Sequence, residues 1–151
     1  MEFVNPTREQ FKILYGLKPN QPVGMLNLVR FRDIAVYAPE DLEKPTTQIS
    51  GRSAYEKYSQ TAEGVFQKTG VVQSWIGQPQ TILIGASDEL WHLAFIATYP
   101  SVKAFIDLVK SDDYQRATKH RTAAVLDSRL IVCAPLLAGN SFAPTHYLDP
   151  H

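Results

Sequence analysis

Three side chains in the last third of the chain have the chemistry of a small active site. His92 lies at the start of a predicted strand, and because an imidazole titrates near neutral pH it is the histidine best placed for acid–base catalysis. Arg121 shares a predicted helical face with Tyr114. If that face lies against a sheet, the guanidinium needs either a protein carboxylate, such as Asp127 or Glu89, or a bound anionic ligand. For His92 the alternative is a hydrogen-bonded histidine at the start of a strand.

Aromatic side chains with a polar tip form the second group of candidates. Such residues suit ligand sites because they combine an apolar ring with a hydrogen-bonding atom. Tyr58 and Tyr114 are also candidate proton carriers for catalysis. The alternative for each is packing in the core with the polar tip at the rim. The group consists of Tyr55, Tyr58, Trp75, Tyr99 and Tyr114.

Two polar residues interrupt the otherwise apolar run over 23–31. Side chains alternate along a strand, so Asn27 points to the same face as Met25, while Arg30 points to the opposite face with Leu28. We expect one of them to reach the cleft between sheet and helices and the other the dimer interface or the rim. A polar residue inside an apolar strand must be satisfied, so each is a candidate substrate contact. For Arg30, the alternative is a charge that reaches solvent from the strand end.

Several kinds of site are not predicted. No histidine has a second one four residues away on a helix, so no metal centre is expected, and nothing in the pattern favours a haem or another cofactor. The glycines are too dispersed for a phosphate-binding loop, and no serine occupies a nucleophile elbow. Cys133, the only cysteine, lies in an apolar run and is predicted to be a small buried hydrophobic residue. His120, one position from the face of Arg121, is predicted to point to solvent.

Length and composition indicate a single globular domain over 1–151. Hydrophobic residues make up 44% of the 151-residue chain and charged residues 20%, which is enough for a sizeable core. The 15 basic and 15 acidic residues balance, so neither nucleic acid nor an anionic membrane is an expected partner. No apolar run approaches the ~20 residues of a membrane helix, and no secretory signal is evident. We therefore expect a cytoplasmic protein.

The first half of the chain contains signals for two helices and a strand. A threonine with a glutamine three residues later forms a capping box, which predicts a short appended helix over 7–16. The run over 23–31 is apolar on both faces and is typical of a strand that is covered on both sides. The polar, proline-containing segment 32–50 is a predicted long loop, and such loops are usually functional or flexible. A helix over 50–70 follows, ending at a glycine.

The second half predicts a hairpin followed by a helical crossover. Residues 71–84 are predicted to form one long or broken strand, interrupted near Gly77 and Pro79, and 91–99 to form its hairpin partner. Two helices follow over 100–125, with acidic residues at the start of the second. Residues 129–134 form the last predicted strand, and 135–151 an irregular tail with three prolines.

This order predicts an α+β fold with a ferredoxin-like split β-α-β core over 23–134. Such a core has a four-stranded antiparallel sheet with two helices on one face. The alternating residues of the predicted strands leave neither face of the sheet polar. Because an exposed apolar face of that size would be a liability, we expect a homodimer in which two sheets pack face to face.

Three stretches of the sequence resemble a known family. They are VGMLNLVRFRD, SGRSAYEKYSQTAEGVF and WHLAFIATYPSVKAFIDLVKSDDYQRATKHRTAAVLDSRLIV, the last with a strand, YPS, helix, DDY, helix, arginine layout. Together they resemble the uncharacterised family called domain of unknown function 1330, of the dimeric α/β-barrel superfamily. The resemblance spans residues 23–134 and implies a ferredoxin-like fold and a barrel-forming homodimer. It implies no reaction, because the superfamily includes cofactor-free monooxygenases, lactone isomerases, haem proteins and binding proteins.

The candidate residues leave two functions open, both using a pocket between the helices and the sheet of each protomer. The first is a cofactor-free enzyme, isomerase-like or monooxygenase-like, acting on a small carboxylate or enolizable substrate. Arg121 would then anchor the carboxylate or enolate, and His92, Tyr58 or Tyr114 would move a proton. The second is a non-catalytic ligand-binding or interaction module of the same fold. A fold does not determine a function, so the sequence leaves both open.

Overall fold

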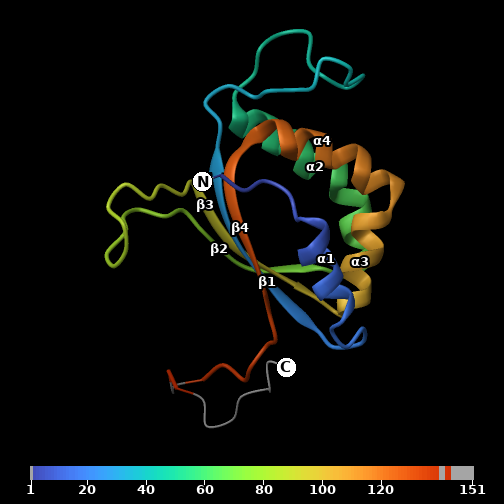
Figure 1. The fold of residues 1–151 in the computed structure, drawn as a ribbon, viewed down its shortest axis with the longest axis vertical. Coiled ribbons are helices and arrows are strands. Elements are labelled where there is room, and N and C mark those ends of the chain that lie inside the picture. Colours follow the sequence, from blue (N-terminus) through green and yellow to red (C-terminus); the bar gives the residue numbers. More distant parts are fainter. Residues whose placement is uncertain (1, 140–141, 144–151) are drawn as a thin grey trace.

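One layer of helices covers one face of a four-stranded sheet (Figure 1). The computed structural model describes residues 2–139 and 142–143. The elements, in chain order, are α1 Arg8–Tyr15, β1 Val23–Phe31, α2 Gly51–Thr69, β2 Val72–Gly77, β3 Leu93–Tyr99, α3 Val102–Lys110, α4 Asp112–Ala124 and β4 Val125–Cys133.

The strand order β2-β3-β1-β4 is that of a ferredoxin-like sheet. All three neighbouring pairs are antiparallel, and β1 is hydrogen-bonded to β3 on one side and β4 on the other. Helix α2 connects β1 to β2, and helices α3 and α4 connect β3 to β4, on the same side of the sheet. This arrangement confirms the predicted α+β, ferredoxin-like architecture.

Serine and threonine caps define where the helices begin. Thr7 accepts a hydrogen bond from the Gln10 N–H at 3.1 Å, and the Gln10 side chain accepts one from the Thr7 N–H, which completes the predicted capping box of α1. Ser111 ends α3 and accepts a hydrogen bond from the Tyr114 N–H at the start of α4. Gly70 ends α2 with φ 75°, a left-handed conformation that glycine adopts without strain. These caps explain why the helix starts could be predicted from sequence.

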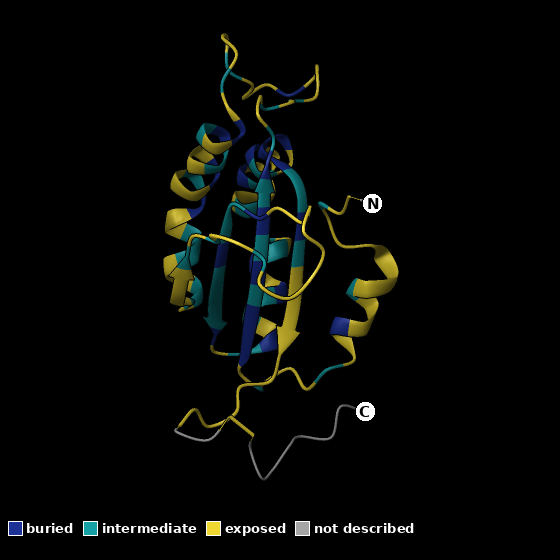
Figure 2. Ribbon diagram, turned by 90° about the vertical axis from the view of Figure 1, so that its left-hand side faces the viewer, coloured by how far each residue is buried: buried dark blue, intermediate teal, exposed yellow. Residues whose placement is uncertain are grey.

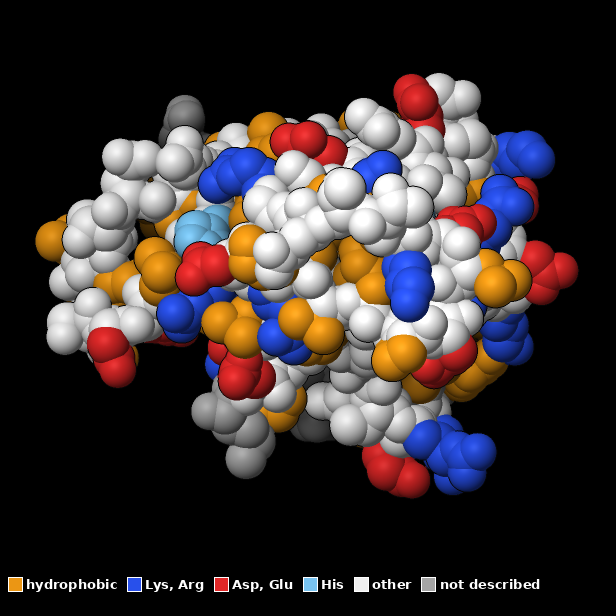
Figure 3. Space-filling model, turned by 90° about the horizontal axis from the view of Figure 1, so that it is seen from above, with side chains coloured by type: hydrophobic (Ala, Val, Ile, Leu, Met, Phe, Trp, Pro, Cys, Tyr) orange, Lys and Arg blue, Asp and Glu red, His pale blue; other side chains and the backbone are white. Residues whose placement is uncertain are grey.

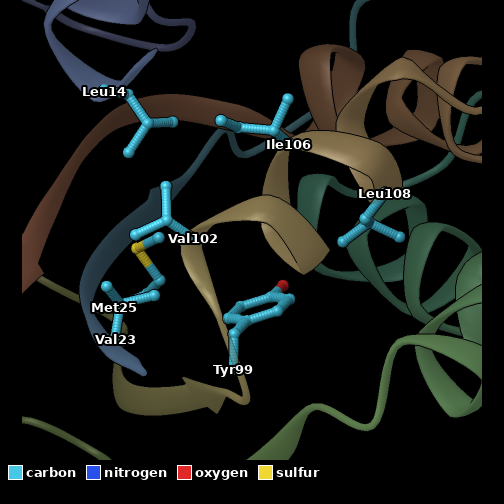
Figure 4. Close-up of a cluster of buried hydrophobic side chains, with 7 residues drawn as sticks. All are labelled: Leu14, Val23, Met25, Tyr99, Val102, Ile106 and Leu108. Carbon is cyan, nitrogen blue, oxygen red and sulfur yellow. The ribbon is translucent and has the colours of Figure 1, made fainter. Parts of the chain in front are cut away.

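The largest buried cluster lies between α1, α3 and the two central strands, β1 and β3 (Figure 4). Met25 of β1 and Val102 of α3 are each only 1% exposed. Leu14 of α1 belongs to the same cluster, so the N-terminal helix packs against the core. Burying a side chain of this size contributes about 1.5–3 kcal/mol to stability. The full set of buried members is Leu14, Val23, Met25, Tyr99, Val102, Ile106 and Leu108.

The faces of β1 follow the predicted alternation. Met25, Asn27 and Val29 are buried, whereas Leu28 and Arg30 are half-buried. Since Met25 and Val29 pack in the two main core clusters under the helices, Asn27 faces the helical layer and Arg30 faces the other side of the sheet.

No helix among the described residues covers the second face of the sheet (Figure 2). Trp75 of β2 is 54% exposed, and it pairs opposite Ile96 of β3. The connection between β2 and β3 projects away from the sheet on this side (Figures 1 and 2). Near its tip, Leu83 and Ile84 are 92% and 95% exposed.

Three predicted strands have different limits in the structure, and the strand predicted over 91–99 differs least, since it begins at Leu93. The strand predicted over 71–84 ends at Gly77, which confirms the predicted interruption near Gly77 and Pro79, because Pro79 has no N–H to donate to a ladder and the chain leaves the sheet there. The last strand begins at Val125, four residues earlier than predicted, because α4 passes directly into β4 without a turn. The predictions were wrong in length but correct in the type and order of the elements.

Two predictions of burial were wrong. Cys133 is exposed, because it ends an edge strand beyond the helical layer. His120 is buried with 6% exposure, because the loop before α2 folds over its side of α4. Of the tail predicted to be irregular, residues 135–139 form no helix or strand, and 140–141 and 144–151 lie outside the described residues.

Candidate functional site

Three of the predicted tyrosines come together between α2 and α4. Tyr55 and Tyr58 lie three residues apart on α2 and therefore share a face, with ring centroids 5.3 Å apart. The Tyr58 hydroxyl lies 3.0 Å from the Tyr114 hydroxyl of α4, within hydrogen-bond distance. We call Tyr55, Tyr58 and Tyr114 the tyrosine cluster. The cluster therefore joins two helices of the layer that covers the sheet.

The two α2 tyrosines are held in their protonated form. Burial raises the pKa of Tyr55 to about 12, and the nearby Arg121 guanidinium only partly offsets this rise. Burial, reinforced by Tyr114 and Tyr55, raises the pKa of Tyr58 well above its usual value. A protonated phenol can donate a hydrogen bond or a proton, but it cannot act as a base. These two tyrosines therefore suit the stabilisation of an oxygen anion rather than proton abstraction.

Arg121 lies beside the tyrosine cluster and contacts neutral oxygen atoms. One guanidinium nitrogen donates to the Val4 carbonyl at 2.6 Å, and the other lies 3.5 Å from the Ser128 hydroxyl. Asp127, one of the two predicted carboxylate partners, instead pairs with Arg129 at 2.7 Å. No carboxylate among the described residues lies within ion-pair distance of Arg121.

Asp127 helps to hold the N-terminal segment next to Arg121. Burial alone would raise the pKa of Asp127, but hydrogen bonds from the Phe3 N–H and from Arg129 lower it below its usual value. Ser128 donates to the Phe3 carbonyl at 2.8 Å. Phe3 and Val4 therefore lie along β4, with the Val4 carbonyl on the guanidinium of Arg121.

His92 lies at the Phe31 end of β1. Its Nδ1 accepts a hydrogen bond from the Phe31 N–H at 2.9 Å, and the two rings stack with 5.6 Å between centroids. Burial lowers the pKa of His92, and the nearby Arg52 and Arg30 lower it further. None of the interactions found among the described residues joins His92 to Arg121. The geometry of His92 is that of a neutral hydrogen-bonded histidine, which is the alternative that the sequence left open.

The remaining candidates lie on different faces of the sheet. Asn27 is buried under the helices, where its amide donates to the Met25 carbonyl at 3.0 Å. Arg30 and Trp75 lie on the face without helices. The structure thus brings Arg121 together with Tyr55, Tyr58 and Tyr114, and it does not bring Arg30 or Trp75 to them.

A second polar cluster joins the loop before α2 to helix α4. The Tyr37 hydroxyl lies 2.6 Å from His120 Nδ1, and His120 Nε2 lies 3.4 Å from a Glu43 carboxylate oxygen. Arg116 of α4 lies 3.6 Å from the same carboxylate group. Sequence reasoning missed this cluster, since Tyr37 and His120 are 83 positions apart. The only signal for it was the unusual length of the loop.

Two of the surface pockets among the described residues have neither Arg121 nor a member of the tyrosine cluster in their linings. A pocket of about 210 Å³ is lined by Ala35, Tyr37 and residues 44–49. The other, of about 340 Å³, lies on the outer side of α2 and includes Phe66. Viewed from the end of the molecule where the loop lies, basic and acidic side chains are interspersed with hydrophobic ones (Figure 3). That end therefore offers no surface of a single charge.

Neither a metal site nor a membrane helix is found in the part of the chain that the structure describes. No three histidine, cysteine, aspartate or glutamate side chains among residues 2–139 and 142–143 are grouped to hold a metal ion. Over the same residues, no helix has the length and apolar character needed to cross a bilayer.

The strand order and the helical layer define the class of the protein, an α+β protein with a ferredoxin-like fold. Residues 45–134 match the family described as domain of unknown function DUF1330. The match covers more than half of the chain, and the protein belongs to this family.

Solved structures resemble the chain as well. The chain is 40% identical to RPA0582, a protein of unknown function from Rhodopseudomonas palustris, over 91% of this chain and 100% of that one, with a TM-score of 0.83. The methylated form of RPA0582 gives 40% identity, 92% and 98% coverage and a TM-score of 0.84. A candidate antibiotic biosynthesis monooxygenase from Bacteroides thetaiotaomicron is 12% identical, with 82% and 97% coverage and a TM-score of 0.50, and shares the fold alone. The chain matches no curated protein sequence.

Proposed function

We propose that the protein binds a small carboxylate or enolate between α2, α4 and β4, with Arg121 as its anchor. The observation that carries the proposal is the unpaired charge of Arg121. This half-buried guanidinium contacts only a backbone carbonyl and a hydroxyl among the described residues. A guanidinium forms its strongest hydrogen bonds with an anionic oxygen, often through two parallel N–H groups. An anion that replaced the Val4 carbonyl would therefore gain a charge-assisted contact.

The tyrosine cluster supplies the second part of the proposed site. In the hydrogen bond between Tyr58 and Tyr114 one hydroxyl donates, so the accepting hydroxyl keeps its own proton for a ligand oxygen. The raised pKa values of Tyr55 and Tyr58 keep these groups as donors at neutral pH. Donors around an arginine favour an anionic ligand with two oxygen-bearing ends, such as a keto acid or its enolate.

Thermal-shift measurements on the full chain test this binding. The probes are pyruvate, acetoacetate and benzoate, and an acid present at 100 times its Kd should stabilise the protein by about 2.7 kcal/mol, a shift of several degrees. Arg121→Gln should abolish the shift. Lys119→Gln, which removes the same charge from an exposed position of α4, is the matched control and should keep it. Equal shifts in the two variants would refute the anchor role of Arg121.

Catalysis is the second candidate, and the free hydroxyl proton of the tyrosine pair is the observation that favours it. A phenol beside a bound enolate can deliver a proton to it without a cofactor. The test is the conversion of the enol of phenylpyruvate to its keto form, followed by ultraviolet absorbance. Conversion that is faster with the protein than without it, and slowed by Tyr114→Phe, would support an enzyme. Binding of the enol without faster conversion would leave the non-catalytic ligand-binding function.

The proposal also includes a homodimer that forms through the sheet faces without helices. Support comes from the exposed apolar residues of that face, including Trp75, and from the projecting tip with Leu83 and Ile84. Exposed apolar groups of this kind favour burial against a second copy. Light scattering at micromolar concentration should give twice the mass of the chain, and Trp75→Glu should shift the protein toward a monomer. A monomeric wild-type protein would refute this part.

A further inference from the structure

We propose that Tyr37, His120 and Glu43 form a proton relay, and that the pocket beside it binds a small neutral molecule with an acidic hydroxyl, such as a phenol or an enol. This site is separate from the one proposed at Arg121, and it uses neither that residue nor the tyrosine cluster. Tyr37 is common to the relay and to the pocket, since it bonds to His120 and also lines the pocket of about 210 Å³.

The three groups lie in the order phenol, imidazole, carboxylate. If Nδ1 of His120 accepts the proton of Tyr37 at 2.6 Å, the ring N–H lies on Nε2, which faces the Glu43 carboxylate at 3.4 Å. A carboxylate on the far nitrogen favours this tautomer and stabilises the imidazolium that would form. The arrangement therefore has a base between a phenol and a carboxylate, and the phenol belongs to a residue that lines the pocket.

Main-chain hydrogen bonds fix the loop that carries Tyr37. The Arg32 N–H donates to the Ala124 carbonyl at 2.8 Å, and the Val36 N–H donates to the Ala123 carbonyl at 2.9 Å. Both acceptors belong to the last turn of α4, the helix that carries His120. The contact between Tyr37 and His120 thus spans two elements that are held together by the backbone.

Charges of both signs lie around Tyr37. Burial raises the pKa of Tyr37, and the carboxylates of Asp41 and Glu43 raise it further, so these carboxylates oppose a ligand that arrives as an anion. Lys44 lines the same pocket and Arg116 lies 3.6 Å from Glu43, so an oxygen anion formed there by proton transfer has cations nearby. The pocket wall combines the side chains of Ala35 and Ile49 with the polar stretch 46–48. A small neutral molecule with one apolar part and one hydroxyl fits this combination.

The proton balance of the relay needs no co-reactant. The ligand O–H bond breaks as its proton passes to the Tyr37 oxygen. The Tyr37 O–H bond breaks as its proton passes to Nδ1 of His120. The ligand becomes an oxygen anion, and the imidazolium beside Glu43 carries the balancing charge. Return of the proton restores the starting state.

The test uses the full chain and 4-nitrophenol, whose ionisation changes its visible absorption. We expect saturable binding, a larger nitrophenolate fraction when bound than when free at the same pH, and NMR shifts at Tyr37, His120 and residues 46–49. Tyr37→Phe should lower the affinity about tenfold or more. Tyr15→Phe, a change at an exposed tyrosine of α1, is the matched control and should bind as wild type does.

Long-range ¹H–¹⁵N spectra of the His120 ring distinguish a proton relay from a merely structural contact, because a structural contact would leave the ring protonation unchanged when the probe binds. Without the probe they should show a neutral ring with its proton on Nε2, and saturation with 4-nitrophenol should convert it to the doubly protonated form. Glu43→Gln should keep the neutral tautomer but reduce this conversion. Absence of binding, binding unaffected by Tyr37→Phe, or an unchanged ring on saturation would each overturn the proposal. Arg121→Gln should leave all of these signals intact.

Discussion

The hydrogen bond between Tyr58 and Tyr114 makes a quantitative prediction about the tyrosine cluster. The two hydroxyls lie 3.0 Å apart, and Tyr58 is only 8% exposed. A buried hydrogen bond between neutral groups contributes about 1 kcal/mol to stability, and a partner left unpaired adds a desolvation penalty. Tyr58→Phe and Tyr114→Phe should therefore each lower the free energy of unfolding by about 1–2 kcal/mol.

A double-mutant cycle isolates the interaction between the two hydroxyls. Because the double variant Tyr58→Phe/Tyr114→Phe leaves no unpaired partner, it should lose less stability than the two single losses added together, by about 1 kcal/mol. Urea unfolding, followed by tryptophan fluorescence at one protein concentration, measures the four free energies, and the slopes should agree. Tyr15→Phe, at an exposed position, should change stability by no more than about 0.5 kcal/mol.

The cycle can fail in a definite way. If the losses of the single variants simply add up in the double variant, the two hydroxyls share no hydrogen bond in solution. The reasoning that leaves one hydroxyl proton for a ligand oxygen would then lose its basis.

Further predictions concern helix packing, alkaline pH and helix capping. Gly51→Ala should destabilise the protein by about 1–3 kcal/mol, because an added Cβ would lie 2.8 Å from the carbonyl oxygen of Ala124 and closer still to that of Arg32. Gly64 of the same helix has open space around it, so Gly64→Ala should stabilise the protein by up to about 1 kcal/mol. Thermal unfolding measures the change in stability of both variants, and a change of the same sign in both would contradict the close packing around Gly51. Burial raises the pKa of Tyr55 from 10.0 to about 12. The contribution of Tyr55 to the free energy of unfolding is therefore intact below pH 10, and it falls by about 1.4 kcal/mol per pH unit as the pH rises to about 12. Urea midpoints should fall less steeply over this window in Tyr55→Phe, and identical slopes would refute the raised pKa. Ser111→Ala should cost about 1 kcal/mol by removing the cap of α4, and an unchanged urea midpoint would count against that cap.

The fold was predictable because its signals are local. The capping box at Thr7 and the run over 23–31 each predict one element from neighbouring residues, and the order of elements then selects a ferredoxin-like sheet. The end of β2 also has a local signal in Gly77 and Pro79, although residues 81–84 keep strand-forming side chains after the chain has left the sheet. The start of β4 was missed because Ala124 and Val125 carry no turn signal.

The candidate site was only partly predictable, because its contacts join distant segments. The shared face of Tyr55 and Tyr58 follows from helical spacing, but their meeting with Tyr114 depends on how α4 packs against α2. The contact between Tyr37 and His120 spans 83 positions, and it depends on a loop whose path no periodicity describes. The carbonyl on Arg121 comes from Val4, at the other end of the chain.

The central claim is that the charge of Arg121 recognises an anion. Its most direct test is calorimetric titration of the wild-type chain and Arg121→Gln with benzoate and with benzamide, its neutral analogue. The wild-type protein should bind the acid about tenfold or more tightly than the amide, and Arg121→Gln should not discriminate between them. Equal preference for the acid in both proteins, or no preference in either, would contradict the claim.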